Sequence, residues 1–273
     1  MTGPAGGAGG GRGGSGRPLP RRGILRAAGA GAAAALGGRA GAGAARAAAP
    51  TGPVHQEAAA AESPAAPPAA APAPDGPLVA LTFDAGSDAG YAALILDLLV
   101  NEAVPASFGV TGRWAQANPA LVARAGAEGH LLLNHTLDHR SFTGVSDRRG
   151  GLAPAARRAE LEAADAILAP LLGRSPRPWY RLPYGDADAR VAADVAPTGY
   201  TRHAGWTVDS LGWQGRPVGE IVARCLRLAA PGAVYLFHVG SDSRDGPALG
   251  AVLDGLRQRG YGFATLEGLP VVP

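Results

Sequence analysis

Every aromatic residue of this 273-residue chain lies between residues 77 and 273. Residues 1–76 contain no Phe, Trp, Tyr or Cys and consist almost entirely of Ala, Gly, Pro and Arg. A segment without large side chains cannot bury enough apolar surface to offset the entropy that it loses on ordering. We therefore expect one folded domain over residues 77–273, which is long enough to enclose a sizeable core.

The first 47 residues have the order of features found in an export signal. A twin arginine at residues 21–22 precedes a mildly apolar stretch over residues 27–36, and small residues follow it. Twin-arginine signals are read by an export machinery. We expect a signal peptide over 1–47, a Pro/Ala-rich disordered linker over 48–76, and a protein that is secreted or held at the cell surface. A disordered arginine-containing tail is the alternative.

The net charge of +3 belongs to the leader. Seven arginines fall within residues 1–46, whereas 18 arginines and 22 acidic residues follow and give that part a charge of −4. Nucleic-acid binding needs a basic footprint on the folded domain, so we expect no such partner. No stretch approaches the roughly 20 apolar residues of a membrane span. The single Cys225 excludes an intrachain disulfide, and we expect a monomer.

From Leu78 onward, strand-like apolar runs alternate with helix-like segments. The runs typical of buried strands are 78–83, 105–110, 131–133, 179–182, 205–208, 234–237 and 262–265. Helical patterns fit between them at 91–100, 118–128, 155–172, 187–195, 218–229 and 247–259. Repeated βα units predict an α/β fold with a parallel sheet. About seven units suit a barrel, in which function gathers at the carboxyl ends of the strands.

Polar residues cluster where these strands end. Asp84 closes the first strand and is followed by small residues that leave room for a ligand. His135 and His139 follow the third strand, and Asp209 and His238 follow later ones. Two histidines four residues apart can chelate one ion, although such a pair can equally be a hydrogen-bonded structural feature. Two imidazoles, a carboxylate and an open water position suit a borderline ion such as Zn²⁺.

Five motifs in this order resemble those of the polysaccharide deacetylases, the NodB-homology enzymes of carbohydrate esterase family 4. They are Thr82-Phe83-Asp84-Ala85-Gly86, His135-Thr136-Leu137-Asp138-His139, Arg181-Leu182-Pro183-Tyr184-Gly185, Asp209-Ser210-Leu211-Gly212-Trp213 and Leu236-Phe237-His238. The likeness covers essentially all of 78–268 and implies a distorted (β/α)7-type barrel. It also implies a hydrolase of C–N bonds with a divalent metal, Zn²⁺ being the expected ion and Co²⁺, Mn²⁺ or Ni²⁺ the alternatives.

The same resemblance implies roles for the polar residues. His135 and His139 would bind the metal, which would acidify a bound water. Asp84 would be the general base, and Arg181 would pair with it and keep it ionised. His238 would protonate the departing amine.

Three further residues would shape the site. The backbone N–H of Tyr184 would stabilise the oxyanion together with the metal. Leu236 and Trp213 would wall the pocket that takes the acetyl methyl group. The rings of Tyr184 and Trp213 are the candidates for stacking on sugar rings.

Two positions depart from the family pattern. Ala85 stands where the family usually has a metal-binding aspartate, and Gly212 stands where an aspartate usually tunes the catalytic histidine. We expect Asp88 to reach the ion from the same loop and Asp209 to support the catalytic histidine. Alternatively, Asp84 binds the metal itself, which leaves the role of the base open.

Taken together, the motifs predict an exported deacetylase that hydrolyses N-acetyl groups of a peptidoglycan-like or chitin-like amidosugar polymer, with O-acetyl esters as a lesser possibility. An inactive glycan-binding relative and a metal-independent hydrolase of another C–N amide are the alternatives. We expect packing or structural roles for His130, His203, Trp114, Trp179 and Trp206, and a polar surface loop at Asp242, Arg244 and Asp245. Asp138 is either a support for the histidines or a solvated acid.

Overall fold

The structure is a computed structural model and describes residues 76–269. The predicted export signal, and the predicted linker up to residue 75, lie outside the described residues. The strands are β1 (Leu78–Ala85), β2 (Ser107–Val110), β3 (Leu131–Asn134), β4 (Trp179–Tyr180), β5 (Arg202–His203), β6 (Val208–Asp209), β7 (Val234–His238) and β8 (Gly262–Ala264). The α-helices are α1 (Ala92–Asn101), α2 (Gly112–Ala117), α3 (Pro119–Ala127), α4 (Pro154–Leu172), α5 (Ala189–Val195), α6 (Val218–Arg227) and α7 (Asp245–Gln258).

All of these strands join one parallel sheet in the order β5-β4-β3-β2-β1-β7-β6. The eighth strand, β8, pairs with the first residues of β1. Within residues 76–269, no ladder joins β5 to β6, so the sheet curls around without closing. The expected distorted barrel of βα units is confirmed in this open form.

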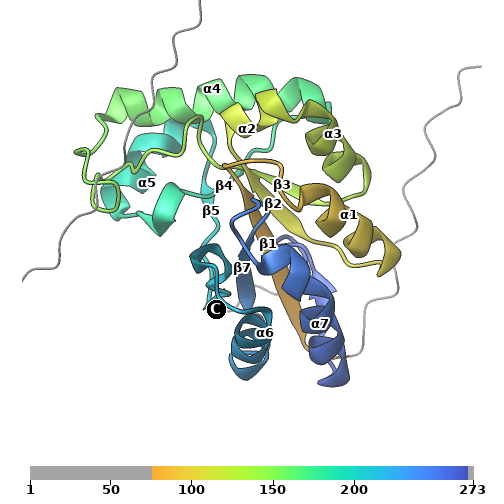
Figure 1. Cartoon of the computed structure of the whole chain (residues 1–273). Coiled ribbons are helices and arrows are strands. Elements are labelled where there is room, and N and C mark those ends of the chain that lie inside the picture. Colours follow the sequence, from red (N-terminus) through yellow and green to blue (C-terminus); the bar gives the residue numbers. More distant parts are fainter. Residues whose placement is uncertain (1–75, 270–273) are drawn as a thin grey trace, which may run out of the picture. The chain divides into compact units, whose positions relative to one another are not determined.

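The helices cover the outside of the curled sheet. Helix α5 contacts α4, α4 contacts α2 and α3, α3 contacts α1, and α1 contacts α7, which packs on α6 (Figure 1). Connections between parallel strands of one sheet are right-handed as a rule, and such connections place the helices on the same face of the sheet. In the described part of the chain, no helix is long and apolar enough to cross a membrane.

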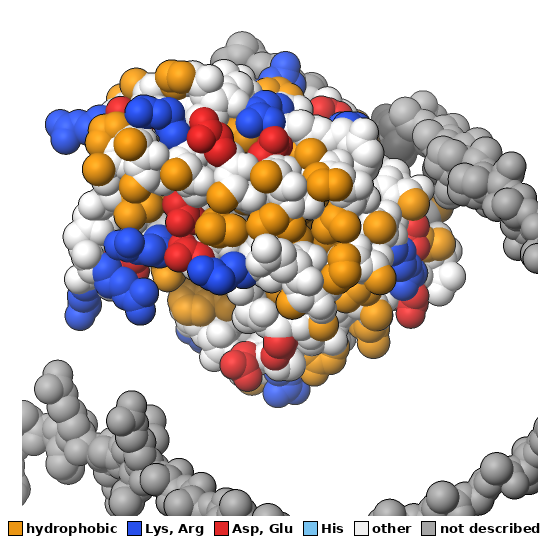
Figure 2. Space-filling model, turned by 90° about the horizontal axis from the view of Figure 1, so that it is seen from above, with side chains coloured by type: hydrophobic (Ala, Val, Ile, Leu, Met, Phe, Trp, Pro, Cys, Tyr) orange, Lys and Arg blue, Asp and Glu red, His pale blue; other side chains and the backbone are white. Residues whose placement is uncertain are grey.

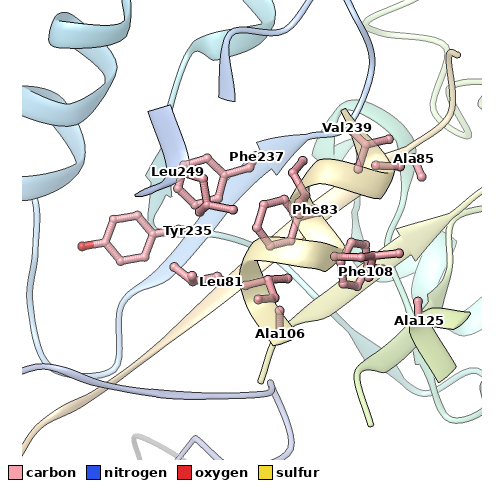
Figure 3. Packing of buried hydrophobic residues seen from close by; sticks show 14 of the residues in the cluster. Leu81, Phe83, Ala85, Ala106, Phe108, Ala125, Tyr235, Phe237, Val239 and Leu249 are labelled. Carbon is pink, nitrogen blue, oxygen red and sulfur yellow. The ribbon is translucent and has the colours of Figure 1, made fainter. Parts of the chain in front are cut away.

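The central strand β1 divides its side chains between two environments. Leu81, Phe83 and Ala85 belong to the apolar cluster under the helices, and Phe83 stacks on Phe108 and Phe237 with ring centroids 5.1 and 5.4 Å apart (Figure 3). Successive strand side chains point to opposite faces, so Thr82 and Asp84 face the concave side. The apolar alternation of β1 therefore aims Asp84 into the interior.

One predicted strand is almost absent from the structure. The run 205–208 was expected to be a strand, but only its last residue, Val208, belongs to one, because β5 ends at His203 and β6 spans Val208–Asp209. The reason lies in the carbonyl groups of Ala204 and Gly205, which accept hydrogen bonds from the Arg181 side chain instead of joining a ladder. Helix α2 was not predicted; Thr111 caps it by accepting a hydrogen bond from the Trp114 N–H at 3.2 Å.

The outer surface of the folded part carries charges of both signs. Figure 2 shows arginine and acidic side chains side by side among apolar ones on the face that it presents. This mixture agrees with the small formal charge of the segment after residue 47.

Candidate active site

Asp84 lies at the end of β1 in a buried ion pair with Arg181. The Arg181 Nη1 atom donates hydrogen bonds of 2.9 Å to Asp84 Oδ1 and to Thr82 Oγ1. The same guanidinium group donates to the carbonyl oxygens of Ala204 and Gly205, and its side chain is fully buried. The pairing of Asp84 with Arg181 that we predicted is present, and Arg181 bridges β1 to the segment between β5 and β6.

Arg181 keeps the Asp84 carboxylate charged. Burial raises the pKa of Asp84, but the positive charge and hydrogen bond of Arg181, together with His238, outweigh burial and lower the pKa below its usual 3.8. A carboxylate that stays ionised at neutral pH can accept a proton, which is what a general base must do.

His135 presents a bare ring nitrogen to this carboxylate. Its Nδ1 lies 2.9 Å from the Arg181 carbonyl oxygen, which can only accept, so Nδ1 carries the hydrogen. Its Nε2 lies 3.4 Å from Asp84 Oδ2 and has no hydrogen-bond partner among the described residues. Burial lowers the pKa of His135, so the ring is neutral and its Nε2 lone pair is free.

His139 completes a pair of imidazoles. Its ring meets that of His135 edge to face, with centroids 4.8 Å apart. Burial lowers the pKa of His139 to about 4, so this imidazole is also neutral at pH 7. Two neutral imidazoles fit a divalent metal. In His135, the Arg181 carbonyl oxygen holds Nδ1, so that the buried Nε2, which has no hydrogen-bond partner among the described residues, is free to bind an ion.

The protein offers only part of a ligand set. Among residues 76–269, no three His, Cys, Asp or Glu side chains form a group that could hold a metal. The Ala85 methyl group is 1% exposed and belongs to the apolar cluster under the helices. The two neutral histidines could supply two ligands to a metal, and the remaining ligands would have to come from solvent or from substrate.

Asp88 does not reach the histidines, in contrast to our expectation. Both of its carboxylate oxygens accept hydrogen bonds from Ser241, from the backbone N–H at 2.7 Å and from the hydroxyl at 2.5 Å. Its carbonyl oxygen accepts a bond from the Trp114 indole. Asp88 thus ties the loop after β1 to the loop after β7, because Ser241 offers it two donors.

Backbone strain is concentrated around the site. Thr136, His139, Tyr184 and Leu211 have φ values of 69°, 63°, 61° and 63° without being glycine. These residues lie in the segments that follow β3, β4 and β6. Such conformations cost about 1–3 kcal/mol each and persist where the surroundings impose them, as at ligand sites.

Asp209 acts on His238 through its charge and makes no hydrogen bond to it. Both of its carboxylate oxygens lie 3.3 Å from the Trp213 indole nitrogen, and Oδ1 also accepts the Leu211 N–H. The carboxylate that contacts His238 is Asp245, the first residue of α7, which accepts the His238 N–H at 2.8 Å. Asp245 is 1% exposed and not part of a surface loop, which corrects our expectation.

The predicted wall residues lie in β7 and in the segments that follow β4 and β6. Leu236 lies in β7 on the strand face of His238, since its neighbours Tyr235 and Phe237 belong to the apolar cluster under the helices. Tyr184 and Trp213 are about half exposed, at 49% and 50%. The Tyr184 and His139 rings pack edge to face with centroids 4.8 Å apart, and the Tyr184 side chain stays about half exposed.

Sequence reasoning missed three supports of the site. Gly109 makes room for Asp84, because a Cβ there would lie 2.6 Å from Asp84 Oδ1. Trp206 covers the Arg181 guanidinium at 5.6 Å and fills the space beside Gly185. Glu160 of α4 accepts the N–H groups of two residues in the histidine motif. Gly109 and Trp206 have no ionisable or metal-binding side chain, so the sequence gives no sign of their part in the site.

Known proteins resemble this chain over much of the part that the structure describes. A family model described as polysaccharide deacetylase matches residues 71–203. A chitooligosaccharide deacetylase of Rhizobium leguminosarum bv. trifolii is 32% identical, over 68% of this chain and 88% of its own. The peptidoglycan-N-acetylmuramic acid deacetylase PdaA of Bacillus subtilis is 29% identical, over 69% and 70%. A crystal structure of a peptidoglycan N-acetylglucosamine deacetylase superposes with a TM-score of 0.64 at 28% identity, covering 71% of this chain and 90% of that one.

Proposed function

This chain belongs to the polysaccharide deacetylase family, and we propose that it removes N-acetyl groups from an amidosugar polymer of the peptidoglycan or chitin type. The observation that carries the proposal is the buried Asp84–Arg181 pair, which lies near two neutral histidines. Asp84 is also the register partner of His238 on the neighbouring strand β7. This arrangement provides a base, an acid and ligands for an ion within one site.

Deacetylases of this family are generally metal-dependent, and His135 and His139 are the residues that would hold the ion. When bound, a divalent metal supplies a Lewis acid that polarises the acetyl carbonyl and acidifies water. The protein's own contribution is to keep both imidazoles neutral and to fix the His135 tautomer through the Arg181 carbonyl oxygen. Zn²⁺ suits imidazole ligands and is the ion that we propose.

Asp84 and His238 divide the proton transfers. Asp84 takes a proton from the water whose oxygen attacks the carbonyl carbon of the acetamide. His238 gives a proton to the nitrogen as the C–N bond breaks, so acetate and a free amine leave. Burial lowers the pKa of His238, but Asp245, Asp84 and Asp209 outweigh burial and raise it above 6.5, which keeps the acid form available near neutral pH.

The strained turn over Pro183–Gly185 and the wall residues act on the acetyl group. The backbone N–H of Tyr184 is the donor that we propose for the oxyanion. Leu236 and Trp213 would enclose the methyl group, and the half-exposed rings of Tyr184 and Trp213 would carry sugar rings.

We also propose export by the twin-arginine route, which rests on the leader sequence at residues 1–47. An exported deacetylase would meet peptidoglycan directly. Fusion of residues 1–47 to a reporter, compared with the same fusion carrying Arg21→Lys and Arg22→Lys, tests this part. Export that is unchanged by the double substitution would contradict it.

Acetate release by the full chain tests the activity. The substrates are chitin oligomers and peptidoglycan, each with a chelator and with added Zn²⁺ or Co²⁺. We expect metal-dependent release that Asp84→Asn reduces at least about 100-fold and that the exposed Asp242→Asn leaves unchanged. Release that resists chelator would instead indicate a metal-independent amide hydrolase, and binding without release under any metal would indicate an inactive glycan-binding protein.

A further inference from the structure

The loop between β7 and α7 brings a buried carboxylate back to the proposed acid. Strand β7 ends at His238, and α7 begins at Asp245. The Asp245 Oδ2 atom accepts hydrogen bonds from the His238 backbone N–H and from the Ser243 hydroxyl, both at 2.8 Å. These bonds fix the carboxylate beside the residue whose ring would move the proton.

The Asp245 carboxylate also faces the His238 ring. His238 Nδ1 lies 3.7 Å from Asp245 Oδ2, slightly beyond hydrogen-bond distance. Both His238 Nδ1 and Asp245 Oδ1 are buried and have no hydrogen-bond partner among the described residues. Buried polar atoms normally find partners, so a small rotation of the ring that pairs these two groups would satisfy both.

Gly212 provides the space that the carboxylate occupies. A Cβ added at Gly212 would lie 2.0 Å from Asp245 Oδ1 and 2.4 Å from its Cγ. The backbone N–H of Arg244 donates to the Gly212 carbonyl oxygen at 3.2 Å, which ties the start of α7 to this glycine. The carboxylate therefore fills the volume into which a side chain at position 212 would project.

On the basis of the deacetylase activity proposed above, we propose that Asp245 is the positioning residue for His238. Its carboxylate, supplied by α7, takes the place of a carboxylate at position 212, where this chain has glycine. It orients the ring through Nδ1 and directs Nε2 toward the substrate. The absence of an acid at position 212 is then compensated from another element.

Other charged groups also act on His238 and contribute to its measured pKa. Asp84 in β1 and Asp209 at the end of β6 add negative charge, and His135 and His139 add positive charge when protonated. Asp209 cannot take the orienting role, because the Trp213 indole and the Leu211 N–H engage its oxygens.

Exchange of the acid between the two positions tests the proposal. The variants are Asp245→Asn, the double substitution Gly212→Asp with Asp245→Ala, and Asp242→Asn as an exposed carboxylate in the same loop. Acetate release gives kcat and KM for each full-length variant. NMR titration of the His238 ring, assigned by its loss in His238→Gln, gives the pKa without any need for activity.

We expect Asp245→Asn to lower kcat about 100-fold with little change in KM, and to lower the pKa of His238 by about one unit. The double substitution should restore the pKa and bring kcat to within about tenfold of the parent. The proposal would be overturned if the His238 pKa were unchanged in Asp245→Asn, or if Asp242→Asn lowered kcat as much as Asp245→Asn does. If Asp245→Asn does not fold, Asp245→Ser keeps an acceptor for the His238 N–H and replaces it.

The two readouts separate this inference from the activity on which it rests. A parent chain that releases no acetate, together with a His238 pKa that follows the acid from 245 to 212, refutes the deacetylase and supports the pairing. Activity that survives Asp245→Asn with an unchanged pKa refutes the pairing and leaves the deacetylase in place.

Discussion

At the scale of single residues, the absence of a side chain decides where the charged groups can lie. Gly109 and Gly212 are both positions where a Cβ would collide with a carboxylate, that of Asp84 in one case and that of Asp245 in the other. Neither glycine has a positive φ, so the requirement is for space. The motifs in the sequence reveal the carboxylates and histidines but not the space that receives them, because that space is formed between two separate segments of the chain.

Gly109→Ala should displace the Asp84 carboxylate. The new methyl group would lie 2.6 Å from Oδ1, so the Asp84–Arg181 pair must shift. We expect kcat to fall at least tenfold and the free energy of unfolding to fall by about 1–3 kcal/mol. The measurements are acetate release and urea unfolding. Gly219→Ala in α6, where a Cβ meets no described atom within 4 Å, is the matched control and should leave activity unchanged.

Ala85→Asp should destabilise the protein. The Ala85 methyl group lies in the apolar cluster beside Phe83, so a carboxylate there is buried without a partner. We expect a loss of about 3 kcal/mol in the free energy of unfolding without metal, measured by urea unfolding. The exposed Ala93→Asp is the control. A variant as stable as the parent, and further stabilised by Zn²⁺, would show that the side chain at 85 turns toward the histidines instead.

At the scale of elements, the site depends on which helix holds which loop. The five residues from His135 to His139 follow β3, and Glu160 of α4 accepts the N–H groups of Leu137 and Asp138 at 3.0 and 3.2 Å. Burial, together with the nearby Asp138 carboxylate, raises the pKa of Glu160. One carboxylate in α4 thus fixes the strained loop that carries both histidines.

Glu160→Ala should loosen this loop. Two backbone N–H groups lose their acceptor, which costs about 1–3 kcal/mol in the free energy of unfolding. The exposed Glu162→Ala on the same helix should cost much less. Hydrogen exchange of the Leu137 and Asp138 amides gives a local measure, and protection equal to that of the parent would contradict the assignment.

Most elements could be predicted from the apolar pattern, because buried parallel strands and amphipathic helices have strong periodicities. The boundaries could not. The last helix was expected to begin at 247 but begins at Asp245. Because of this shift of two positions, Asp245 was expected in a surface loop and not beside His238. The role expected for Asp88 differs from its contacts because it meets the donor Ser241, which is distant in sequence. Asp209 meets Trp213, four residues further on, and the sequence does not show that the indole N–H turns back to this carboxylate.

At the scale of the whole molecule, neutral buried histidines link the fold to pH. His130 Nδ1 accepts the Ala106 N–H at 3.3 Å, and His203 Nε2 accepts the Leu182 N–H at 3.2 Å. A protonated ring could not accept either bond. Burial lowers the pKa of each to about 4, in accord with the structural roles that we expected.

The melting temperature should therefore fall as the pH drops from 6.5 to 4. The unfolded chain binds protons on these histidines below their ordinary pKa near 6.5, whereas the folded chain does not, so stability rises with pH in this window. Each shift corresponds to at most about 3 kcal/mol. Thermal melting at several pH values measures the effect, and His203→Gln should flatten the curve. Equal melting temperatures at pH 7 and 4.5 would contradict this account.

The buried guanidinium of Arg181 also limits which residues of such a protein could be changed in a redesign. It joins β1 to the segment between β5 and β6, two strands that do not pair with each other in the described sheet. It also holds the proposed base, Asp84. A designer who alters it changes chemistry and foldability together. Substrate scope is better varied at the half-exposed rings of Tyr184 and Trp213, which can be exchanged without disturbing this interior connection.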